Sequence, residues 1–159
     1  MKNDTPMSEG IPTGAGLWNQ LVVDDPHCLS GPSVATVLTA VIEKCGLTKI
    51  VAFDLEGAYT GLRGLEGEVI PSTEFLKRVA DATQYDWGWF FLYGKDHTPP
   101  SQRLDDWSMI TNADITIRLV DDTYIYFYWS DRAACVDVRN LFPASEMKSC
   151  SLTDLDMPN

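Results

Sequence analysis

Apolar residues recur at helical spacing in two stretches of the chain. In the first, which begins near Ser33, they fall three or four positions apart until Gly46 supplies a C-terminal stop. The second can be capped by Ser72 or Thr73 and is expected to run to about Gln84. The apolar positions are Val34, Val37, Leu38, Val41, Ile42 and Cys45 in the first stretch, and Phe75, Leu76, Val79 and Ala80 in the second. The pattern therefore predicts two amphipathic helices.

Short runs of β-branched, aromatic and other apolar residues predict strands elsewhere. The expected strands cover residues 17–23, 49–54, 87–93, 115–120, 124–129 and 134–139. The run 87–93 is apolar on both faces, which is typical of an interior strand. The last three runs are joined by short turns and predict an antiparallel meander. The sequence thus indicates an α+β fold with a mixed or antiparallel sheet of about five or six strands, a C-terminal three-stranded meander, and two main helices packed on one face.

The remaining segments lack such periodicity. Residues 1–16 mix small, polar and proline residues, so we expect a flexible N-terminal arm. Residues 17–143 form the expected single globular domain, and residues 144–159 an acidic, polar tail with little to bury. Within the domain, residues 55–67 and 94–113 predict loops, the second of them unusually long.

The pairing of residues 115–120 with 124–129 decides which side chains face solvent, because a shift of one residue reverses both faces. A loop of even length would leave each face half apolar. A three-residue loop of Asp121, Asp122 and Thr123 instead brings the large apolar side chains onto one face. These are Ile115, Ile117, Leu119, Ile125, Phe127 and Trp129. Burial stabilises each by about 1.5–3 kcal/mol, so we expect the three-residue loop.

The opposite face of this hairpin is then aromatic and partly polar. It holds Thr116, Arg118 and Val120 beside Tyr124, Tyr126 and Tyr128, and we call these three tyrosines the tyrosine row. Tyrosine combines a broad contact area with a polar tip and a low entropy cost on binding, so it is enriched at interfaces. Two alternatives stay open: a loop or the C-terminal tail covers the tyrosine row, or its amphipathic side chains simply tolerate water.

The 159-residue chain is strongly acidic. Against 23 Asp and Glu stand 12 Lys and Arg, which gives a formal net charge of −11. Such a field repels the phosphates of nucleic acid and of anionic lipid, so neither a nucleic-acid nor a membrane partner is expected. It attracts a basic protein and speeds the encounter at low salt. The alternative is that the charge only keeps the protein soluble.

The cysteines Cys28, Cys45, Cys135 and Cys150 are widely spaced and form no CxxC pair or Cys/His cluster. Neither a zinc site nor a redox pair is therefore expected. The N-terminal residues lack the apolar stretch of an export signal, so we expect a cytoplasmic protein with free thiols. Two disulfides are the alternative if a leader segment had been removed.

No motif for catalysis or cofactor binding stands out, so neither an enzyme nor a bound cofactor is expected. The glycine-rich stretch around Arg63 has no Lys-Ser/Thr ending, and its glutamates would repel a phosphate. The chain has two histidines, His27 and His97, and no GxSxG or HExxH motif accompanies them. The best-placed carboxylate pair is Asp54 with Glu56, at the end of a predicted strand.

A functional expectation follows from the acidic charge, the tyrosine row and the lack of catalytic motifs. We expect a small acidic inhibitory protein, with the general character of bacterial immunity proteins and antitoxins, that neutralises a basic toxin or enzyme by direct binding. The residues expected to contact this partner are Glu56, Tyr59, Glu66, Arg118, Asp121, Asp122, Tyr124, Tyr126 and Tyr128. The alternative is an enzyme or a small-ligand-binding domain with a carboxylate site near Asp54 and Glu56.

Overall fold

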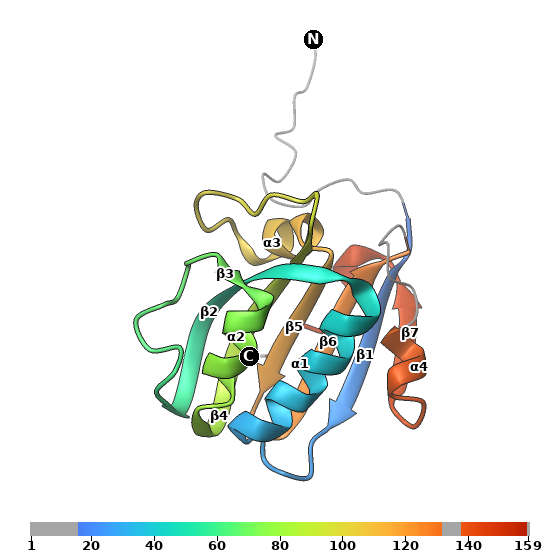
Figure 1. Cartoon of the computed structure of the whole chain (residues 1–159). Helices are drawn as coiled ribbons and strands as arrows, with labels where there is room; N and C mark the ends of the chain where they lie inside the picture. Colours follow the sequence, from blue (N-terminus) through green and yellow to red (C-terminus); the bar gives the residue numbers. More distant parts are fainter. Residues whose placement is uncertain (1–15, 132–137, 159) are drawn as a thin grey trace.

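The computed structural model describes residues 16–131 and 138–158 of the chain. In this part, one seven-stranded sheet has the order β3-β2-β4-β5-β6-β1-β7, and every neighbouring pair is antiparallel (Figure 1). The strands are β1 (Trp18–Asp24), β2 (Leu47–Tyr59), β3 (Ile70–Pro71), β4 (Ala82–Gly94), β5 (Ile115–Val120), β6 (Tyr124–Ser130) and β7 (Glu146–Cys150). The helices are α1 (Gly31–Cys45), α2 (Ser72–Val79), α3 (Asp106–Asn112) and α4 (Val138–Leu141), followed by a 3₁₀ turn, η1 (Leu152–Asp154). The α+β class is confirmed, with seven strands in place of the expected five or six.

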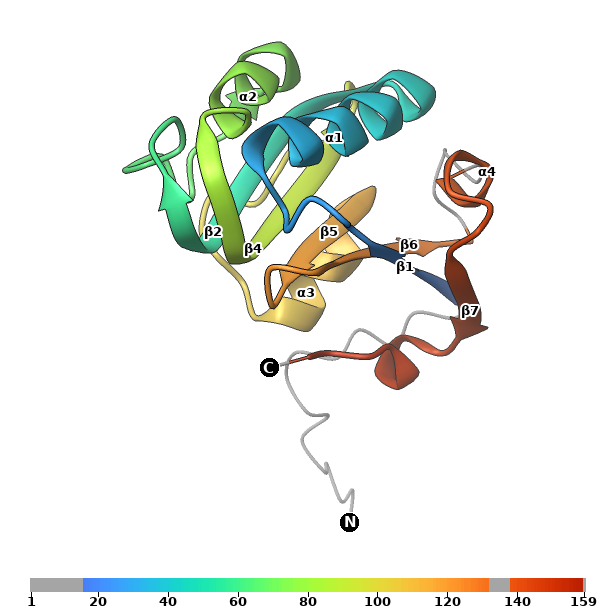
Figure 2. The ribbon, with the colours of Figure 1, turned by 90° about the horizontal axis from the view of Figure 1, so that it is seen from below.

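The sheet separates two hydrophobic layers (Figure 2). Helices α1 and α2 cover what we call the first face, as predicted for the two main helices. On the second face, α3 and the C-terminal residues 151–157 cover part of the sheet. Both layers are built from the same strands, because alternate residues of a strand point to opposite faces. The helices therefore bury the first face over the central strands, whereas the second face is covered only in part.

Helix α1 forms where the apolar stripe predicts it. The Ser30 side chain accepts a hydrogen bond from the Ser33 amide at 3.3 Å, and Gly46, with a φ of +62°, ends the helix. At the start of α1, Gly31 packs closely on the residues that follow α2. A Cβ at Gly31 would lie 2.3 Å from the main-chain oxygen of Ala80, so this contact requires glycine.

Helix α2 ends at Val79, well before the expected limit at Gln84. Gln84 lies instead in β4, because the next residue, Tyr85, is fully buried. The Tyr85 hydroxyl donates to the Val79 main-chain oxygen at 2.8 Å, and its amide donates to the Leu29 oxygen at 3.0 Å. Burial of this ring overrides the local helical pattern. β4 lies between β2 and β5, so the prediction of an interior strand at 87–93 is confirmed.

The β5–β6 hairpin has the predicted register. Ile117 pairs with Phe127 and Leu119 with Ile125, which puts the apolar set on the first face and the tyrosine row on the second. The prediction of a third meander strand over residues 134–139 is wrong where the structure describes it, because Val138 lies in α4. Residues 134–137 of that prediction lie outside the described residues. β6 pairs instead with β1, which matches it residue for residue over 124–130.

Two further expectations differ from the structure. The expected loop 94–113 contains α3, whose N-cap Asp105 accepts a hydrogen bond from the Ser108 amide at 3.0 Å. The expected tail carries β7 and η1, and Leu152 and Leu155 are each only 5% exposed, so the expectation of little to bury is wrong. The expected N-terminal arm lies outside the described residues, apart from Gly16.

The cysteines divide into two kinds. Cys28 and Cys150 are free thiols, as expected, whereas Cys45 is disulfide-bonded, so the expectation of free thiols throughout is wrong. Cys135 lies outside the described residues. Within residues 16–131 and 138–158, no helix is both long and apolar enough to cross a membrane.

Candidate functional site

A row of side chains runs across five strands of the second face. Trp89, Arg118, Tyr126, Val22 and Glu146 occupy successive partner positions on β4, β5, β6, β1 and β7. Directly opposed residues in an antiparallel sheet project to the same side, so these five side chains are neighbours. Trp89 is 4% exposed, the next three are partly exposed, and Glu146 is exposed. This row marks the limit of the cover that α3 and residues 151–157 give to the sheet.

We call the part of the second face that stays accessible the open face. It is lined by Val22, Trp87, Trp89, Arg118, Tyr124, Tyr126 and Glu146. The adjacent cross-strand row is Phe91, Thr116, Tyr128 and Gln20, all of which are buried. The open face is therefore continuous with a packed layer, which fixes the position of its strands. Each end of the open face is hollowed.

The first hollow lies over β2, β4 and β5 and has a volume of about 500 Å³. It is lined by Asp54, Glu56, Trp87, Gly88, Trp89, Asp106 and Arg118. The Arg118 guanidinium lies 4.3 Å from the ring centre of Trp89 and 5.6 Å from that of Trp87. Contact with indole rings is favourable for a cation and holds the guanidinium in one orientation. Burial lowers the pKa of Arg118 from its ordinary value, although the group stays charged at neutral pH.

The second hollow, of about 440 Å³, lies over β6, β1 and β7. It is lined by Gln20, Val22, Tyr124, Tyr126, Glu146, Met147, Lys148 and Asp156. Tyr124 is 40% exposed and Met147 36%, so this end of the open face offers accessible apolar area. Tyr126 stacks on Tyr128 with ring centres 6.2 Å apart. Burial also raises the pKa of Tyr126, whose hydroxyl therefore stays protonated and able to donate a hydrogen bond.

The C-terminal residues cover the third member of the tyrosine row. The Tyr128 hydroxyl donates to the Asp156 main-chain oxygen at 2.7 Å, and burial raises its pKa. Gln20 and Asp156 bond each other reciprocally, side chain to side chain at 2.8 Å and Asp156 amide to Gln20 oxygen at 2.7 Å. The Gln20 bond lowers the pKa of Asp156, and Lys148 lies 3.2 Å from the same carboxylate. Tyr124 and Tyr126 remain accessible, whereas Tyr128 is buried.

Acidic side chains outnumber basic ones in the two hollows. Their linings include five carboxylates, Asp54, Glu56, Asp106, Glu146 and Asp156, against the two cations Arg118 and Lys148. Beside the first hollow, Arg103 binds both oxygens of Asp54 and lies 3.4 Å from Asp106. Part of the negative charge of the chain thus lies at the open face, beside its aromatic side chains.

The aspartates of the β5–β6 turn lie next to this face. Asp121 and Asp122 have φ values of +53° and +50°, a conformation that Asp tolerates better than most residues. Asp122 accepts a hydrogen bond from the Gln84 side chain at 3.2 Å, and its amide donates to the Asp86 oxygen at 3.0 Å. Turn geometry accounts for both aspartates, and Asp121 stays exposed beside Tyr124.

Two of the expected contact residues lie away from the tyrosine row. The Glu66 carboxylate accepts a hydrogen bond from the Leu55 amide at 2.7 Å, where the pairing of β2 with β4 is irregular. Tyr59 packs with the first-face layer and stacks on Tyr85 at 5.7 Å between ring centres. Glu66 therefore satisfies a main-chain donor and Tyr59 supports the end of β2. Glu56 and Arg118, by contrast, share the first hollow.

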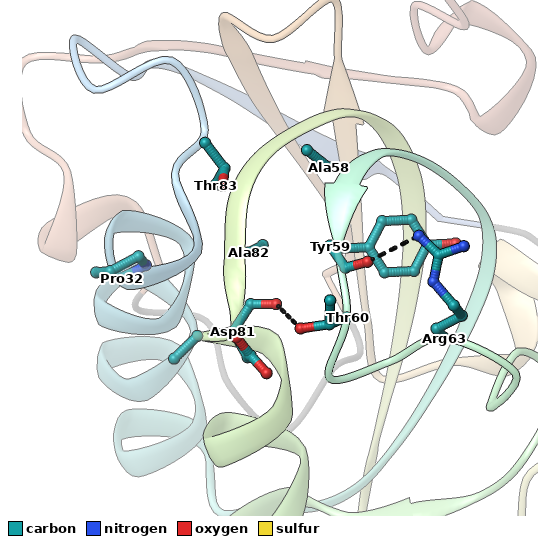
Figure 3. A pocket seen from close by; sticks show the side chains of 9 residues that line it. Pro32, Ala58, Tyr59, Thr60, Arg63, Asp81, Ala82 and Thr83 are labelled. Atoms are coloured by element: carbon teal, nitrogen blue, oxygen red, sulfur yellow. Dashed lines mark hydrogen bonds between the residues drawn. The ribbon is translucent and has the colours of Figure 1, made fainter.

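Tyr59 also lines a separate hollow of about 470 Å³ between the ends of β2, α1 and α2 (Figure 3). There the Arg63 guanidinium donates to the Tyr59 main-chain oxygen at 3.1 Å and lies 5.5 Å from the ring centre. Thr60 donates through both its amide, at 3.1 Å, and its hydroxyl, at 3.3 Å, to the Asp81 main-chain oxygen. These polar groups bond one another. They therefore hold the end of β2 to the segment after α2 and do not converge on a ligand.

Of the two carboxylates in the catalytic alternative, Asp54 is already paired with a cation. Asp54 has a φ of +53° and is held by Arg103, which lowers the pKa of its carboxyl. A general acid near neutral pH needs the opposite shift. Among the described residues, no group of three or more His, Cys, Asp and Glu is placed to hold a metal ion. Asp54 is thus suited to binding by charge, with Glu56 beside it in the first hollow.

Several residues of the open face and its two hollows are not among those expected from the sequence. Trp87, Trp89, Asp106, Glu146 and Asp156 line the two hollows, yet they come from separate regions of the chain. The alternation of Trp87 and Trp89 about Gly88 is a signal that both indoles share one face of a strand. No family model, curated protein or solved structure matches this chain. The functional inference therefore depends on the geometry and charge of the open face.

Proposed function

We propose that this protein binds and inhibits a basic protein through the open face, in the manner of an immunity protein or antitoxin that neutralises a basic toxin or enzyme. The observation that supports this is the five-strand row from Trp89 to Glu146, with carboxylates in the hollows at both of its ends. Aromatic anchors surrounded by polar groups are the usual composition of a protein interface.

The open face is preorganised for binding. Its residues project from paired strands, and Tyr128 and Gln20 in the adjacent buried row are hydrogen-bonded to Asp156. Side chains that are already held in place lose little conformational entropy when a partner docks. Tyr124 and Tyr126 supply accessible contact area, and the hollows can receive projecting side chains of the partner.

The charge of the chain specifies the kind of partner. A net charge of −11 attracts basic proteins over long distances, and the five carboxylates of the hollows place part of that charge at the contact surface. Complementary charge mainly raises the association rate and excludes acidic competitors. A basic toxin or enzyme meets both requirements, and covering its functional surface is sufficient for inhibition.

The first experiment identifies the partner. The reading frames that flank the gene are expressed singly and together with this chain, and the proposal expects one that is toxic alone and tolerated in its presence. The purified pair is then titrated at low and high salt, and binding should weaken as salt rises, mainly through the association rate. A toxic neighbour that remains toxic and does not bind would contradict the proposal for that pair.

Matched charge reversals then locate the surface. Glu146 lies on the open face and Glu43 lies on α1, which covers the opposite face; both side chains are exposed. Glu146→Lys should weaken binding by about tenfold, whereas Glu43→Lys should change it less than about threefold. Equal effects from both variants would show that the net charge alone, and not the open face, determines binding.

A second candidate is catalysis or small-ligand binding in the first hollow, because Asp54 and Glu56 line a space of about 500 Å³. It requires the Asp54 carboxylate, so Asp54→Asn should abolish the activity while the protein still folds. If partner inhibition survives this substitution in full and no metabolite copurifies with the wild-type chain, the binding proposal is favoured over this one.

A further inference from the structure

We propose that Arg118 receives a carboxylate from the partner, so that the open face selects a surface in which one acidic side chain is surrounded by lysines and arginines. This inference rests on the proposed function and specifies the chemistry of the partner. It follows from the position of Arg118, its contacts, and the carboxylates that surround it.

Arg118 lies in the middle of the open face. On β5 it is directly opposite Trp89 of β4 on one side and Tyr126 of β6 on the other. Its guanidinium rests on the ring of Trp89 at 4.3 Å and near that of Trp87 at 5.6 Å. Stacking engages the flat face of a guanidinium and leaves its N–H edges able to donate, and the buried Tyr128 hydroxyl is within reach of one of them.

Two of the three carboxylates of the first hollow, those of Asp54 and Asp106, are engaged by Arg103. Arg103 binds both oxygens of Asp54 and lies 3.4 Å from a carboxylate oxygen of Asp106. Among the described residues, no carboxylate lies within 4.0 Å of the Arg118 guanidinium. The hydroxyl of Tyr128 is close enough to favour its charged form. Arg118 is therefore a half-buried cation that lacks a direct ion-pair partner, whereas Arg103 has two.

Docking makes this arrangement costly unless the partner supplies an acceptor. A partner that covers the open face removes water from Arg118, which is partly exposed, and a buried guanidinium whose donors lack acceptors is strongly unfavourable. A carboxylate accepts two parallel N–H bonds and matches the fork of the guanidinium. A wholly acidic partner is repelled by the five carboxylates of the hollows. An isolated carboxylate within a basic surface satisfies both conditions.

The experiment is a double-mutant cycle with synthetic peptides. Two nine-residue peptides carry four lysines on each side of a central Asp or a central Asn, and each is titrated at low salt into the wild-type chain and into Arg118→Met. Methionine keeps an unbranched side chain over Trp89 and removes the donors. Binding is followed by tryptophan fluorescence, since Trp87 and Trp89 both lie in the first hollow.

The wild-type chain should bind the Asp peptide at least as tightly as the Asn peptide, although the Asp peptide carries less positive charge. The Arg118→Met protein should bind the Asn peptide more tightly. The ratio of the affinities for the Asp and Asn peptides should therefore differ by about three- to tenfold between the two proteins. Arg118→Lys keeps the charge but loses the planar fork, and its coupling should be intermediate. Circular dichroism of each variant shows whether it folds, and the lysine variant keeps the test valid if the methionine variant does not.

The outcomes separate this inference from the proposed function. If both peptides bind but the Asp-to-Asn preference is the same with and without Arg118, the inference is wrong and the basic-partner proposal stands. If neither peptide binds the wild-type chain, the open face does not attract lysine-rich segments, and both are overturned. If Glu146→Lys and Glu43→Lys weaken the peptides equally, the peptides do not occupy the open face, and the inference is likewise overturned.

Discussion

Tyr128 donates its hydroxyl hydrogen bond to the main-chain oxygen of Asp156 at 2.7 Å and thereby connects the sheet to the C-terminal residues. The two residues are far apart in sequence, and Gln20 strengthens the connection by bonding Asp156 through both its amide nitrogen and its oxygen. This contact helps to hold the C-terminal residues on the second face, next to the open face.

The first prediction concerns the energy of that contact. Tyr128→Phe keeps the buried ring and removes the hydroxyl, which leaves the Asp156 oxygen without this donor. We expect the free energy of unfolding to fall by about 1 kcal/mol, the usual value for a lost hydrogen bond. Urea unfolding measures the change. Tyr124→Phe is the matched control, because Tyr124 is 40% exposed, and its effect should stay within about 0.5 kcal/mol.

The second prediction is a pH dependence of stability that depends on Asp54. Arg103 holds the pKa of this carboxyl below its ordinary value of 3.8. A carboxyl whose pKa is lowered on folding stabilises the protein above its unfolded pKa, and this contribution disappears as the pH falls through the folded pKa. Because 56% of the Asp54 side chain is exposed, the effect should be below about 1 kcal/mol.

Urea unfolding of the wild-type chain and of Asp54→Asn between pH 2 and 7 measures this effect. The difference between them should be full above about pH 5 and decrease steadily as the pH falls below the unfolded pKa of the carboxyl. In the Arg103→Met background the same substitution should have little pH-dependent effect, since the charge that lowers the pKa is gone. A difference that persists unchanged in that background would show that Arg103 is not the cause.

The hairpin shows what local pattern alone can predict. Ile117, Leu119 and their β6 partners fix the register, because any shift exposes large apolar side chains. The loop that follows from this register places Asp121 and Asp122 in the left-handed region, where Asp is tolerated. Helix α1 is predictable for the same kind of reason: its stripe and its glycine stop are encoded within one short segment.

The open face depends on contacts that no local pattern encodes. Trp89 lies opposite Arg118 because β4 pairs with β5 across the α3 segment, and Val22 joins the row only because β1 inserts between β6 and β7. The C-terminal cover of Tyr128 depends on Leu152 and Leu155, two apolar residues in an otherwise polar stretch. Glu66 is likewise an expected partner contact from the sequence, yet its carboxylate accepts a hydrogen bond from the Leu55 amide.

The third prediction tests the junction of α1 with α2. A Cβ at Gly31 would lie 2.3 Å from the Ala80 oxygen and 2.7 Å from the Ala82 oxygen, both main-chain atoms that cannot move independently. Gly31→Ala should therefore lower the free energy of unfolding by at least about 2 kcal/mol, despite the better helix propensity of alanine. Gly64→Ala is the control. The φ of Gly64 is +78°, but a Cβ added there would meet no surrounding atom within 4 Å. This substitution should therefore cost about 1 kcal/mol, from backbone strain alone. Equal losses would mean that close packing at Gly31 is not what requires glycine.

The fourth prediction separates binding from stability at the centre of the open face. Tyr126 is partly exposed and lies between Arg118 and Val22, so Tyr126→Ala removes contact area without opening a deep cavity. Against the partner found by coexpression, we expect the dissociation constant to rise at least tenfold, as for a central aromatic anchor. Thermal unfolding should show only a modest loss of stability for the free protein.

The control is Val69→Ala, at a 49% exposed apolar residue before β3. It removes apolar area outside the open face and should leave the affinity for the partner unchanged. A Tyr126→Ala protein that is as stable as the wild type and binds the partner as tightly would exclude this part of the sheet from the interface.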